Sequence, residues 1–472
     1  MSVLLVQPNY ERTRRSGAWL INPPIGLAYI AAVLEKNGIN VDILDANASN
    51  LSPEKTAEKA KKYDIVGVSL LTPAYNFGIS LMKKLPSDVL KVGGGPHATG
   101  LPEELLRNGF DIVVRGEGEF AFLDIVKGKP QKKIDGISYK KNGRIVHNKD
   151  SEPIDPNILP FPARDLLPSN GVDLPYLSAG TIYRPWSPIV TSRGCPFNCY
   201  YCMKGIFGWK FRPRTPDNVL AEIRFLVEKY GVKEFDISDD AFNFDIKRAE
   251  KIMDGIIKLK KETGREFFLR VSNGMRVDRV TETFLKKMKD AGCIHIAYGV
   301  ESGNQTVLDK IPKSITLGKI RAGIELTRKV GIPSISGFFM LGLIGDNRKT
   351  MEDTINFAKS LDLDRVSISL TTPYPGTRLF EEIRKNGRFL FNFKNWEDYH
   401  HTSGRIMFTH PDVAQPKVIK YMYQKYYREF YFRPEYVIKQ ISKIRSLGQL
   451  QMMSRGLIAI VKSTIKKQSL VE

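Results

Sequence analysis

The chain has 472 residues, 42% of them hydrophobic and 26% charged, a globular composition that excludes disorder, collagen and coiled coil. This length predicts two or three domains, and the formal charge of +21 predicts a partner or surface that tolerates positive charge. No apolar run reaches the roughly 18–20 residues of a spanning helix, and the N-terminus is not a signal peptide, so we expect a cytoplasmic protein.

Residues 1–127 alternate short apolar strands with helices. Strands are expected near residues 2–6, 40–45, 65–71, 89–93 and 112–114, and one helix over residues 25–36. Strands and helices that alternate at this spacing predict an α/β fold with a doubly wound parallel sheet. In such sheets ligands bind at the carboxyl ends of the strands.

Two of these strand ends are unusual. Ser69-Leu70-Leu71 places a hydroxyl group at one strand end, and Gly93-Gly94-Gly95-Pro96-His97 places three glycines at the next. Glycines remove side chains where a large ligand can approach the backbone. A tight turn from strand to helix explains the same glycines equally well.

Residues 128–186 differ in composition and are expected to form a linker. A hairpin over residues 136–146 turns at Asn142-Gly143. Six prolines then follow at short intervals, at positions 153, 156, 160, 162, 168 and 175. We expect an extended strap between domains that is not a folding unit of its own.

Residues 187–390 contain six strand candidates separated by amphipathic helices. The strands are expected at residues 189–191, 235–238, 267–271, 294–300, 334–341 and 366–370. Eight such units close a full barrel, so six predict a partial (β/α)6 barrel that is open on one side. Polar residues cluster just after these strands, where the chemistry of such barrels resides.

Three of the four cysteines lie within eight residues, as Cys195-Pro-Phe-Asn-Cys199-Tyr-Tyr-Cys202. This clustering indicates a metal centre in a reducing cytosol and no disulfide framework. Zinc sites usually use four protein ligands, and no fourth Cys or His lies nearby. Iron–sulfur cubanes also usually take four thiolates, so three leave one iron open. The remaining cysteine, Cys293, is expected to be a small buried side chain.

The CxxxCxxC spacing resembles the signature of the radical S-adenosylmethionine (SAM) enzymes. The resemblance implies a [4Fe-4S] cluster on Cys195, Cys199 and Cys202, whose open iron chelates SAM. One electron, supplied by a reducing electron-transfer protein, then cleaves SAM to a 5′-deoxyadenosyl radical that abstracts hydrogen from an unactivated carbon. An ordinary side-chain base cannot do this, because such a C–H bond is far too weak an acid.

Polar residues after the later strands resemble the SAM site of this family. By position, the implied SAM-binding residues are Asp239 and Asp240 after the second strand, Ser272 and Asn273 after the third, and Glu301 and Ser302 after the fourth. Gly342 to Asp346 resembles the loop that approaches adenine, although Gly-Leu-Ile-Gly-Asp replaces the usual Gly-Leu-Pro-Gly.

The first segment resembles the cobalamin-binding domain fused ahead of the barrel in one radical SAM class. Ser69 and Leu71 match its Ser-x-Leu, and Gly93, Gly94 and Gly95 match its Gly-Gly, which implies that they line the channel for the nucleotide tail. The loop whose histidine ligates cobalt is missing, because residues 9–16 contain no His. We therefore expect base-off cobalamin without a histidine ligand, with His97 contacting the corrin or its tail.

The resemblance implies methyl transfer from methylcobalamin to a small-molecule or lipid substrate, most simply a lipid or isoprenoid. Oxidative cyclisation, as in anaerobic magnesium-protoporphyrin cyclase, and C–C coupling are alternatives within the family. A non-catalytic cobalamin and iron–sulfur binding protein is an alternative of another class. A residue like Glu301 disfavours it, because a structural cluster needs no SAM pocket.

Residues 391–472 are expected to form a basic helical extension. Residues 415–472 carry 12 Lys and Arg against 3 Asp and Glu, and residues 420–432 read KYMYQKYYREFYF. Apolar residues recur at helical spacing over residues 438–465, which favours peripheral attachment to an anionic membrane surface. Packing of such a helix on the barrel is the alternative. Nucleic acid is disfavoured, because no RNA-binding module is recognisable.

Overall fold

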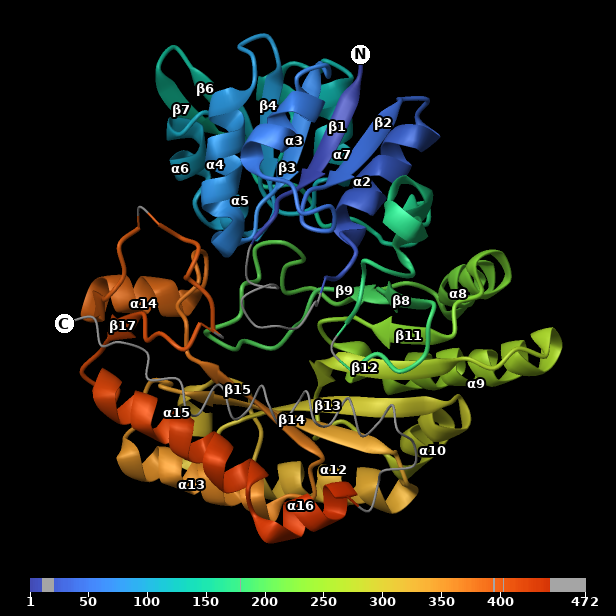
Figure 1. The fold of residues 1–472 in the computed structure, drawn as a ribbon, viewed down its shortest axis with the longest axis vertical. Coiled ribbons are helices and arrows are strands. Elements are labelled where there is room, and N and C mark those ends of the chain that lie inside the picture. Colours follow the sequence, from blue (N-terminus) through green and yellow to red (C-terminus); the bar gives the residue numbers. More distant parts are fainter. Residues whose placement is uncertain (11–20, 179, 394, 402, 442–472) are drawn as a thin grey trace.

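In the computed structural model, residues 1–10, 21–178, 180–393, 395–401 and 403–441 are described. Two lobes lie one above the other (Figure 1): the first sheet with its helices, and a larger lobe built on a six-stranded sheet. Residues at or just after the carboxyl ends of strands from both sheets line one cavity between the lobes, so the fold brings the expected ligand-binding ends of both sheets together.

The upper lobe confirms the doubly wound sheet. Its parallel strands run in the order β2-β1-β3-β4-β5. Both faces of β1 are covered: α2 and α7 pack on one side, and α3, α4 and α6 on the other. The bounds are β1 (Val3–Gln7), α2 (Ile25–Lys36), β2 (Val41–Asp45), α3 (Pro53–Ala60), β3 (Ile65–Ser69), α4 (Tyr75–Lys84), β4 (Leu90–Gly94), α5 (Pro96–Gly100), α6 (Pro102–Arg107), β5 (Ile112–Val114) and α7 (Glu119–Val126).

The hairpin of the predicted strap belongs to this sheet, in contrast to the sequence-based expectation. β6 (Ile137–Lys141) pairs antiparallel with β5, and β7 (Arg144–His147) pairs with β6. Ile137 and Tyr139 are buried in the core of the upper lobe. The hairpin therefore covers what would otherwise be the exposed edge of β5, and the sheet continues beyond residue 127. The extended part of the linker begins after residue 147.

The lower lobe confirms six parallel strands, in the order β8-β11-β12-β13-β14-β15. Their bounds are β8 (Trp186–Ile189), β11 (Glu234–Ile237), β12 (Phe268–Met275), β13 (Cys293–Glu301), β14 (Ser334–Leu341) and β15 (Arg365–Leu370). The helices are α8 (Pro216–Tyr230), α9 (Ile246–Thr263), α10 (Glu282–Asp290), α11 (Gln305–Lys310), α12 (Leu317–Val330), α13 (Arg348–Ser360) and α14 (Arg378–Asn386). A short ribbon of β9 (Ser192–Arg193) and β10 (Arg212–Pro213) begins and ends the cysteine loop.

The C-terminal extension packs on the barrel over its described part. After the short ribbon β16 (Arg388–Phe389) and β17 (Phe408–Thr409), α15 (Pro416–Tyr431) lies along α13 (Figure 1), and α16 (Pro434–Ile441) follows. Ile419, Met422, Tyr426 and Phe430 are buried, at the spacing of one helix face. The packing alternative is therefore correct for α15, whose aromatic residues are part of the barrel core.

The membrane-surface prediction for residues 442–472 lies outside the described residues. Of the helices that are described, none combines the length and the apolar character needed to cross a bilayer.

Candidate active site between the lobes

A cavity of about 630 Å³ lies between the two lobes. Its upper wall comes from the ends of β3 and β4 and from α2, and its lower wall includes the cysteine loop. Among the residues that line it are Gly26, Ile30, Ser69, Gly93, Gly94, Gly95, Glu117, Glu119, Arg193, Cys195, Cys202, Lys204, Asp240 and Asn273. The structure thus brings residues expected to bind three different cofactors to one space.

The three successive glycines serve different purposes. A Cβ atom on Gly93 would lie 2.8 Å from the Leu105 side chain, so this glycine permits packing of α6. Gly95 has φ +90°, and its Cβ would lie 2.9 Å from the Leu70 nitrogen, so it permits the turn. A Cβ on Gly94 has no neighbour nearer than the Val114 oxygen at 3.9 Å. A larger side chain there would project into the cavity, so Gly94 is suited to a bulky ligand.

Of the other residues predicted to contact cobalamin, one lines the cavity and two do not. Ser69 lines the cavity, whereas Leu71 is 38% exposed and is not among the lining residues. His97 is buried outside the cavity, with ring contacts to Tyr75 at 4.9 Å and Trp396 at 5.0 Å. His97 therefore sits in an aromatic cluster between the upper lobe and the C-terminal extension, and no lining residue of the cavity is a histidine.

The cysteine loop brings two of its three cysteines to the cavity. Cys195 and Cys202 line it, whereas Cys199 is buried and is not among the lining residues. The hydrogen bond between Cys202 and Cys199 lowers the pKa of the Cys199 thiol, as does the nearby Lys313. The same hydrogen bond, together with burial, raises the pKa of the Cys202 thiol. A thiolate is the form that binds iron. No three His, Cys, Asp or Glu side chains of the described residues converge on one metal-ion position. A cubane does not require this, because each cysteine binds a different iron.

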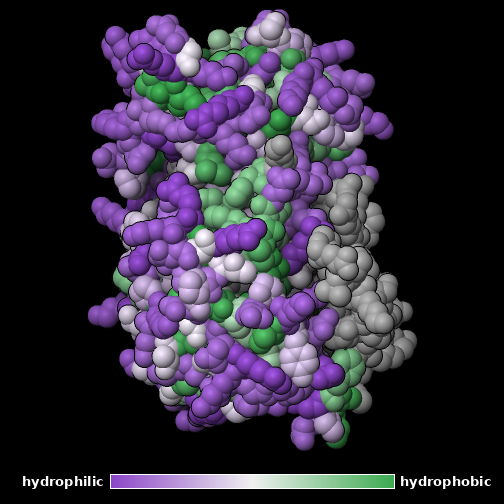
Figure 2. Space-filling model, turned by 90° about the vertical axis from the view of Figure 1, so that its left-hand side faces the viewer, coloured by the Kyte–Doolittle hydropathy of each residue, from purple (hydrophilic) through white to green (hydrophobic). Residues whose placement is uncertain are grey.

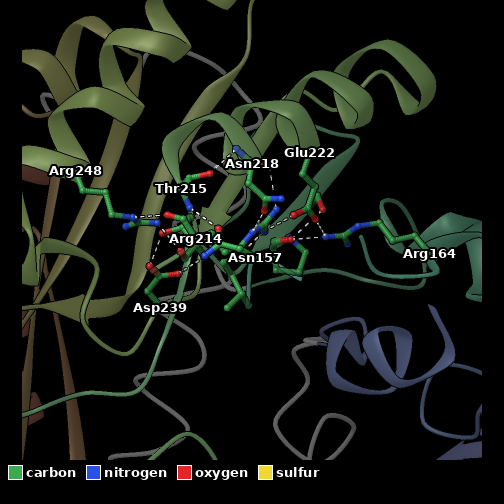
Figure 3. Close-up of polar contacts among 12 residues, drawn as sticks. Asn157, Arg164, Arg214, Thr215, Asn218, Glu222, Asp239 and Arg248 are labelled. Atoms are coloured by element: carbon green, nitrogen blue, oxygen red, sulfur yellow. Dashed lines mark hydrogen bonds and ion pairs between the residues drawn. The ribbon is translucent and has the colours of Figure 1, made fainter. Parts of the chain in front are cut away.

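A buried polar network fixes the strand that enters this loop (Figure 3). The Asp239 carboxylate accepts hydrogen bonds from the Thr191 nitrogen at 2.5 Å, the Thr191 hydroxyl at 2.5 Å and the Ser192 hydroxyl at 2.6 Å. Arg214 donates to the Val190 carbonyl at 2.9 Å and pairs with Glu222 at 2.5 Å. The structure thus gives Asp239 contacts that order residues 191–192, whereas its neighbour Asp240 lines the cavity.

Arg164 and Arg248 extend the same network on two sides (Figure 3). Arg164 of the linker donates to the Pro188 carbonyl at 2.8 Å and pairs with Glu222 at 3.3 Å. Arg248 of α9 donates to the Arg214 carbonyl at 2.7 Å and to the Thr191 carbonyl. The chain before the first cysteine is therefore anchored to the linker and to two helices of the barrel.

The acid predicted to contact SAM lies at the end of β13 in an unusual environment. Glu301 has φ +69° and forms a buried ion pair with Lys313, whose Nζ lies 2.6 Å from Oε1. Lys313 also donates to the Gly299 carbonyl at 2.7 Å, so its position is fixed by two acceptors. Lys313 belongs to no motif, and nothing in the sequence indicated this role.

The remaining predicted SAM residues lie on neighbouring strand ends. Asn273 lines the cavity and donates to the Asp239 carbonyl at 3.0 Å. Ser272 is not among the lining residues, and its backbone nitrogen donates to Asp236 Oδ1 at 3.1 Å. Ser302 is engaged elsewhere, because its hydroxyl lies 3.2 Å from that of Thr354 and accepts from the Asn304 nitrogen at 3.2 Å.

The loop that resembles the adenine contact is held by a buried carboxylate. Asp346 accepts hydrogen bonds from the Gly342 and Leu343 nitrogens, each at 3.0 Å. The Ile344 nitrogen donates to the hydroxyl of Tyr200 at 3.0 Å, and Tyr200 belongs to the cysteine loop. The fifth-strand loop and the cysteine loop are therefore in direct contact.

Comparisons with known proteins identify the family of this chain. The model of the radical SAM superfamily matches residues 189–358, and that of the B12 binding domain matches residues 19–126. An uncharacterized methyltransferase of Pyrococcus horikoshii is 35% identical over 93% of this chain and 95% of its own length. The anaerobic magnesium-protoporphyrin IX monomethyl ester cyclase of Rubrivivax gelatinosus is 29% identical over 81% of this chain and 70% of its own.

Two solved structures share the fold over nearly the whole chain. TsrM from Kitasatospora setae, a radical SAM methyltransferase, has a TM-score of 0.71 at 15% identity and covers 99% of this chain and 100% of its own. OxsB, a cobalamin-dependent SAM radical enzyme, has a TM-score of 0.74 at 15% identity and covers 98% of this chain and 72% of its own.

Proposed function

The chain belongs to the cobalamin-binding radical SAM family, and we propose that it transfers a methyl group to an unactivated carbon of a lipid or isoprenoid-type substrate. It is a radical SAM enzyme with a [4Fe-4S] cluster, SAM and cobalamin as cofactors. When bound, these cofactors supply the radical that removes hydrogen and the methyl group that replaces it. The chain itself binds, orients and shields the reactants.

The proposal rests on the cavity that the two lobes share. Gly94 from the upper lobe and Cys195 and Cys202 from the lower lobe line the same space. In this proposal the cysteines hold the cluster, Gly94 gives room for the corrin, and SAM contacts Asn273 of the cavity wall. Glu301 at the end of β13 is proposed as a second SAM contact, although it is not among the lining residues. A substrate between the lobes would then meet both reactive cofactors at close range, which is what a transfer between them requires.

Methylation is favoured over cyclisation by the relatives. The relative with 35% identity over almost its whole length is named a methyltransferase, whereas the cyclase relative has 29% identity over 70% of its length. Oxidative cyclisation is the second candidate, because the match to that cyclase extends over 81% of this chain.

A lipid-type substrate is supported by the apolar side chains of the cavity wall, which include Ile25, Leu27, Ile30, Ile206 and Phe207. Apolar walls of this kind bind a hydrocarbon better than a charged metabolite. Peripheral attachment to the membrane would rest on residues 442–472, whose basic and apolar residues alternate.

The proposal is tested with anaerobically reconstituted enzyme, isotope-labelled SAM and a lipid extract of cells that lack the gene. Transfer of the labelled methyl group into one lipid, with S-adenosylhomocysteine and 5′-deoxyadenosine formed in equal amounts, is the expected result. A modified lipid without label and without S-adenosylhomocysteine would overturn methylation and favour cyclisation. Label confined to water-soluble metabolites would overturn the lipid assignment.

A further inference from the structure

The two arginines at the ends of the cysteine loop, Arg193 and Arg212, form ion pairs with the same carboxylate of the upper lobe, Glu117. Arg193 ends β9 and Arg212 begins β10, and the two residues are paired across the ribbon. Arg193 Nη1 lies 2.6 Å from Glu117 Oε1, and Arg212 Nη1 lies 2.7 Å from Glu117 Oε2. Both oxygens of one upper-lobe carboxylate are therefore bound by the two ends of the loop that holds the cysteines.

A second carboxylate completes the arrangement. Arg193 Nη2 lies 2.7 Å from Glu119 Oε1, so one guanidinium group spans two glutamates through two separate nitrogens. The Arg193 guanidinium also lies over the Tyr29 ring of α2 at 5.0 Å and the Phe207 ring of the cysteine loop at 5.2 Å. Its planar shape is needed for both kinds of contact, which a lysine cannot reproduce.

Burying these four charged side chains costs free energy unless each charge has a partner of opposite sign. The side chains of Arg193, Glu117, Glu119 and Arg212 are 3%, 4%, 6% and 7% exposed. Two positive and two negative charges balance, so none of the four is left unpaired in the interior. Buried ion pairs stabilise a fold little compared with apolar residues of similar size, and one well-supported use for them is to fix a unique arrangement.

The position of the group indicates what arrangement it fixes. Glu117, Glu119 and Arg193 line the cavity, and Arg193 lies two residues before Cys195. On its other side the same chain is held by Asp239 through Thr191 and Ser192 (Figure 3). The cysteine loop is thus anchored to the barrel by one network and to the cobalamin-binding lobe by the other.

We propose that Arg193, with Glu117, Glu119 and Arg212, is a positioning bridge that sets the separation and orientation of cobalamin relative to the cluster and SAM. Arg193 acts through the loop and the lobe and does not itself react. The inference rests on the proposed function only for one of its two readouts, the formation of S-adenosylhomocysteine. A shift of about 1 Å in reacting groups can cost on the order of 100-fold in rate, so the bridge is expected to matter for transfer between cofactors.

The test compares Arg193→Lys and Glu119→Gln with a matched control, Arg270→Lys. Arg270 pairs with Glu234 at 3.1 Å, and the two side chains are 3% and 0% exposed, but both residues belong to the barrel. Each variant is reconstituted with iron, sulfide and cobalamin. The first readout is the electron paramagnetic resonance of cob(II)alamin, whose relaxation by the reduced cluster depends on the distance between them.

The second readout is the ratio of S-adenosylhomocysteine to 5′-deoxyadenosine formed from SAM under titanium(III) citrate. The first product requires methyl transfer from SAM to reduced cobalamin, in which the S–CH₃ bond breaks and a Co–CH₃ bond forms with the cobalt electron pair. The second requires only the cluster and SAM. We expect both bridge variants to lose the wild-type relaxation and to lower the ratio by about 10- to 100-fold, while Arg270→Lys keeps both.

Wild-type relaxation and ratio in both bridge variants would overturn the proposal, as would equal losses in Arg270→Lys. If Arg193→Lys takes up no cluster, Glu119→Gln decides, because its substitution lies in the other lobe. Absence of S-adenosylhomocysteine from the wild-type enzyme would count against methylation alone, and the relaxation readout would still decide whether the bridge sets the distance.

Discussion

Lys313 Nζ lies 2.6 Å from Glu301 Oε1, and both residues are buried, at 6% and 9% exposure. Removing one partner of such a pair leaves an uncompensated charge in the interior, which costs about 3–5 kcal/mol. We predict that Lys313→Met and Glu301→Gln each lower the free energy of unfolding by about this amount, measured by chemical denaturation without SAM. The double variant is expected to lose less than the sum of the single losses. Additive losses would show that the two charges do not depend on each other.

Each of the three loop cysteines is expected to be needed for the cluster, whereas the fourth is not. We predict that Cys195→Ala, Cys199→Ala and Cys202→Ala lose the iron and sulfide that anaerobic reconstitution gives the wild type. Cys293 is buried at the start of β13, and burial raises the pKa of its thiol to about 12, so it stays a neutral packing group. Cys293→Ala is therefore the matched control and should keep the full iron content. Loss of iron in that variant would contradict the three-ligand assignment.

A side chain at residue 94 is expected to exclude cobalamin without unfolding the upper lobe. A Cβ atom there has 3.9 Å of clearance, and valine suits a strand, so Gly94→Val should fold and fill the cavity wall. We predict that its affinity for hydroxocobalamin falls by about tenfold or more, as each 1.4 kcal/mol of lost contact costs tenfold. Absorbance after gel filtration measures the bound cobalamin. Gly318→Ala, where a Cβ meets nothing within 4 Å, is the control. Normal cobalamin uptake by Gly94→Val would remove this glycine from the site.

The carboxylate that holds the fifth-strand loop makes stability depend on pH. Burial raises the pKa of Asp346 from 3.8 to about 6, although hydrogen bonds from Thr350, Leu343 and Gly342 oppose the shift. Between these two values the folded chain keeps a proton that the unfolded chain releases, so this group's contribution to stability falls as pH rises. The loss amounts to about 3 kcal/mol and is complete above pH 6.

Asp346→Asn keeps an oxygen acceptor for the Gly342 and Leu343 nitrogens but cannot ionise. We predict that the melting temperature of Asp346→Asn increases relative to that of the wild type as the pH rises from 4.5 to 7. Scanning calorimetry of both proteins across this range measures the difference. A difference that stays constant with pH would show that Asp346 is not the titrating group.

The sequence predicted what depends on local patterns. Alternating apolar segments predicted the strands of both parallel sheets in their order along the chain. The cysteine spacing predicted which loop lines the cavity. The hairpin over residues 137–147 was assigned to the strap, because its pairing with β5 depends on a partner about 25 residues away. Nothing in its own sequence distinguishes a sheet edge from an isolated hairpin.

Roles that depend on distant partners could not be predicted. Asp239 was expected at SAM, but its oxygens are bound by residues 47 and 48 positions earlier. Arg193 and Glu117 are 76 positions apart, and only the fold shows that they meet. Both residues lie in short glycine-containing segments, Arg115-Gly-Glu-Gly-Glu119 and Ser192-Arg193-Gly194, and neither segment by itself identifies its partner.

We infer that Cys195, Cys199 and Cys202 hold the cluster and leave one iron free to bind and cleave SAM. The most direct measurement is the formation of 5′-deoxyadenosine from SAM by the oxygen-free, reconstituted and chemically reduced enzyme, with Cys199→Ala in parallel. We predict the nucleoside and an equal amount of methionine from the wild type, and neither from the variant. An iron-replete wild-type protein that leaves SAM intact, or a variant that still cleaves it, would show that the three cysteines do not hold a cluster with an iron open to SAM.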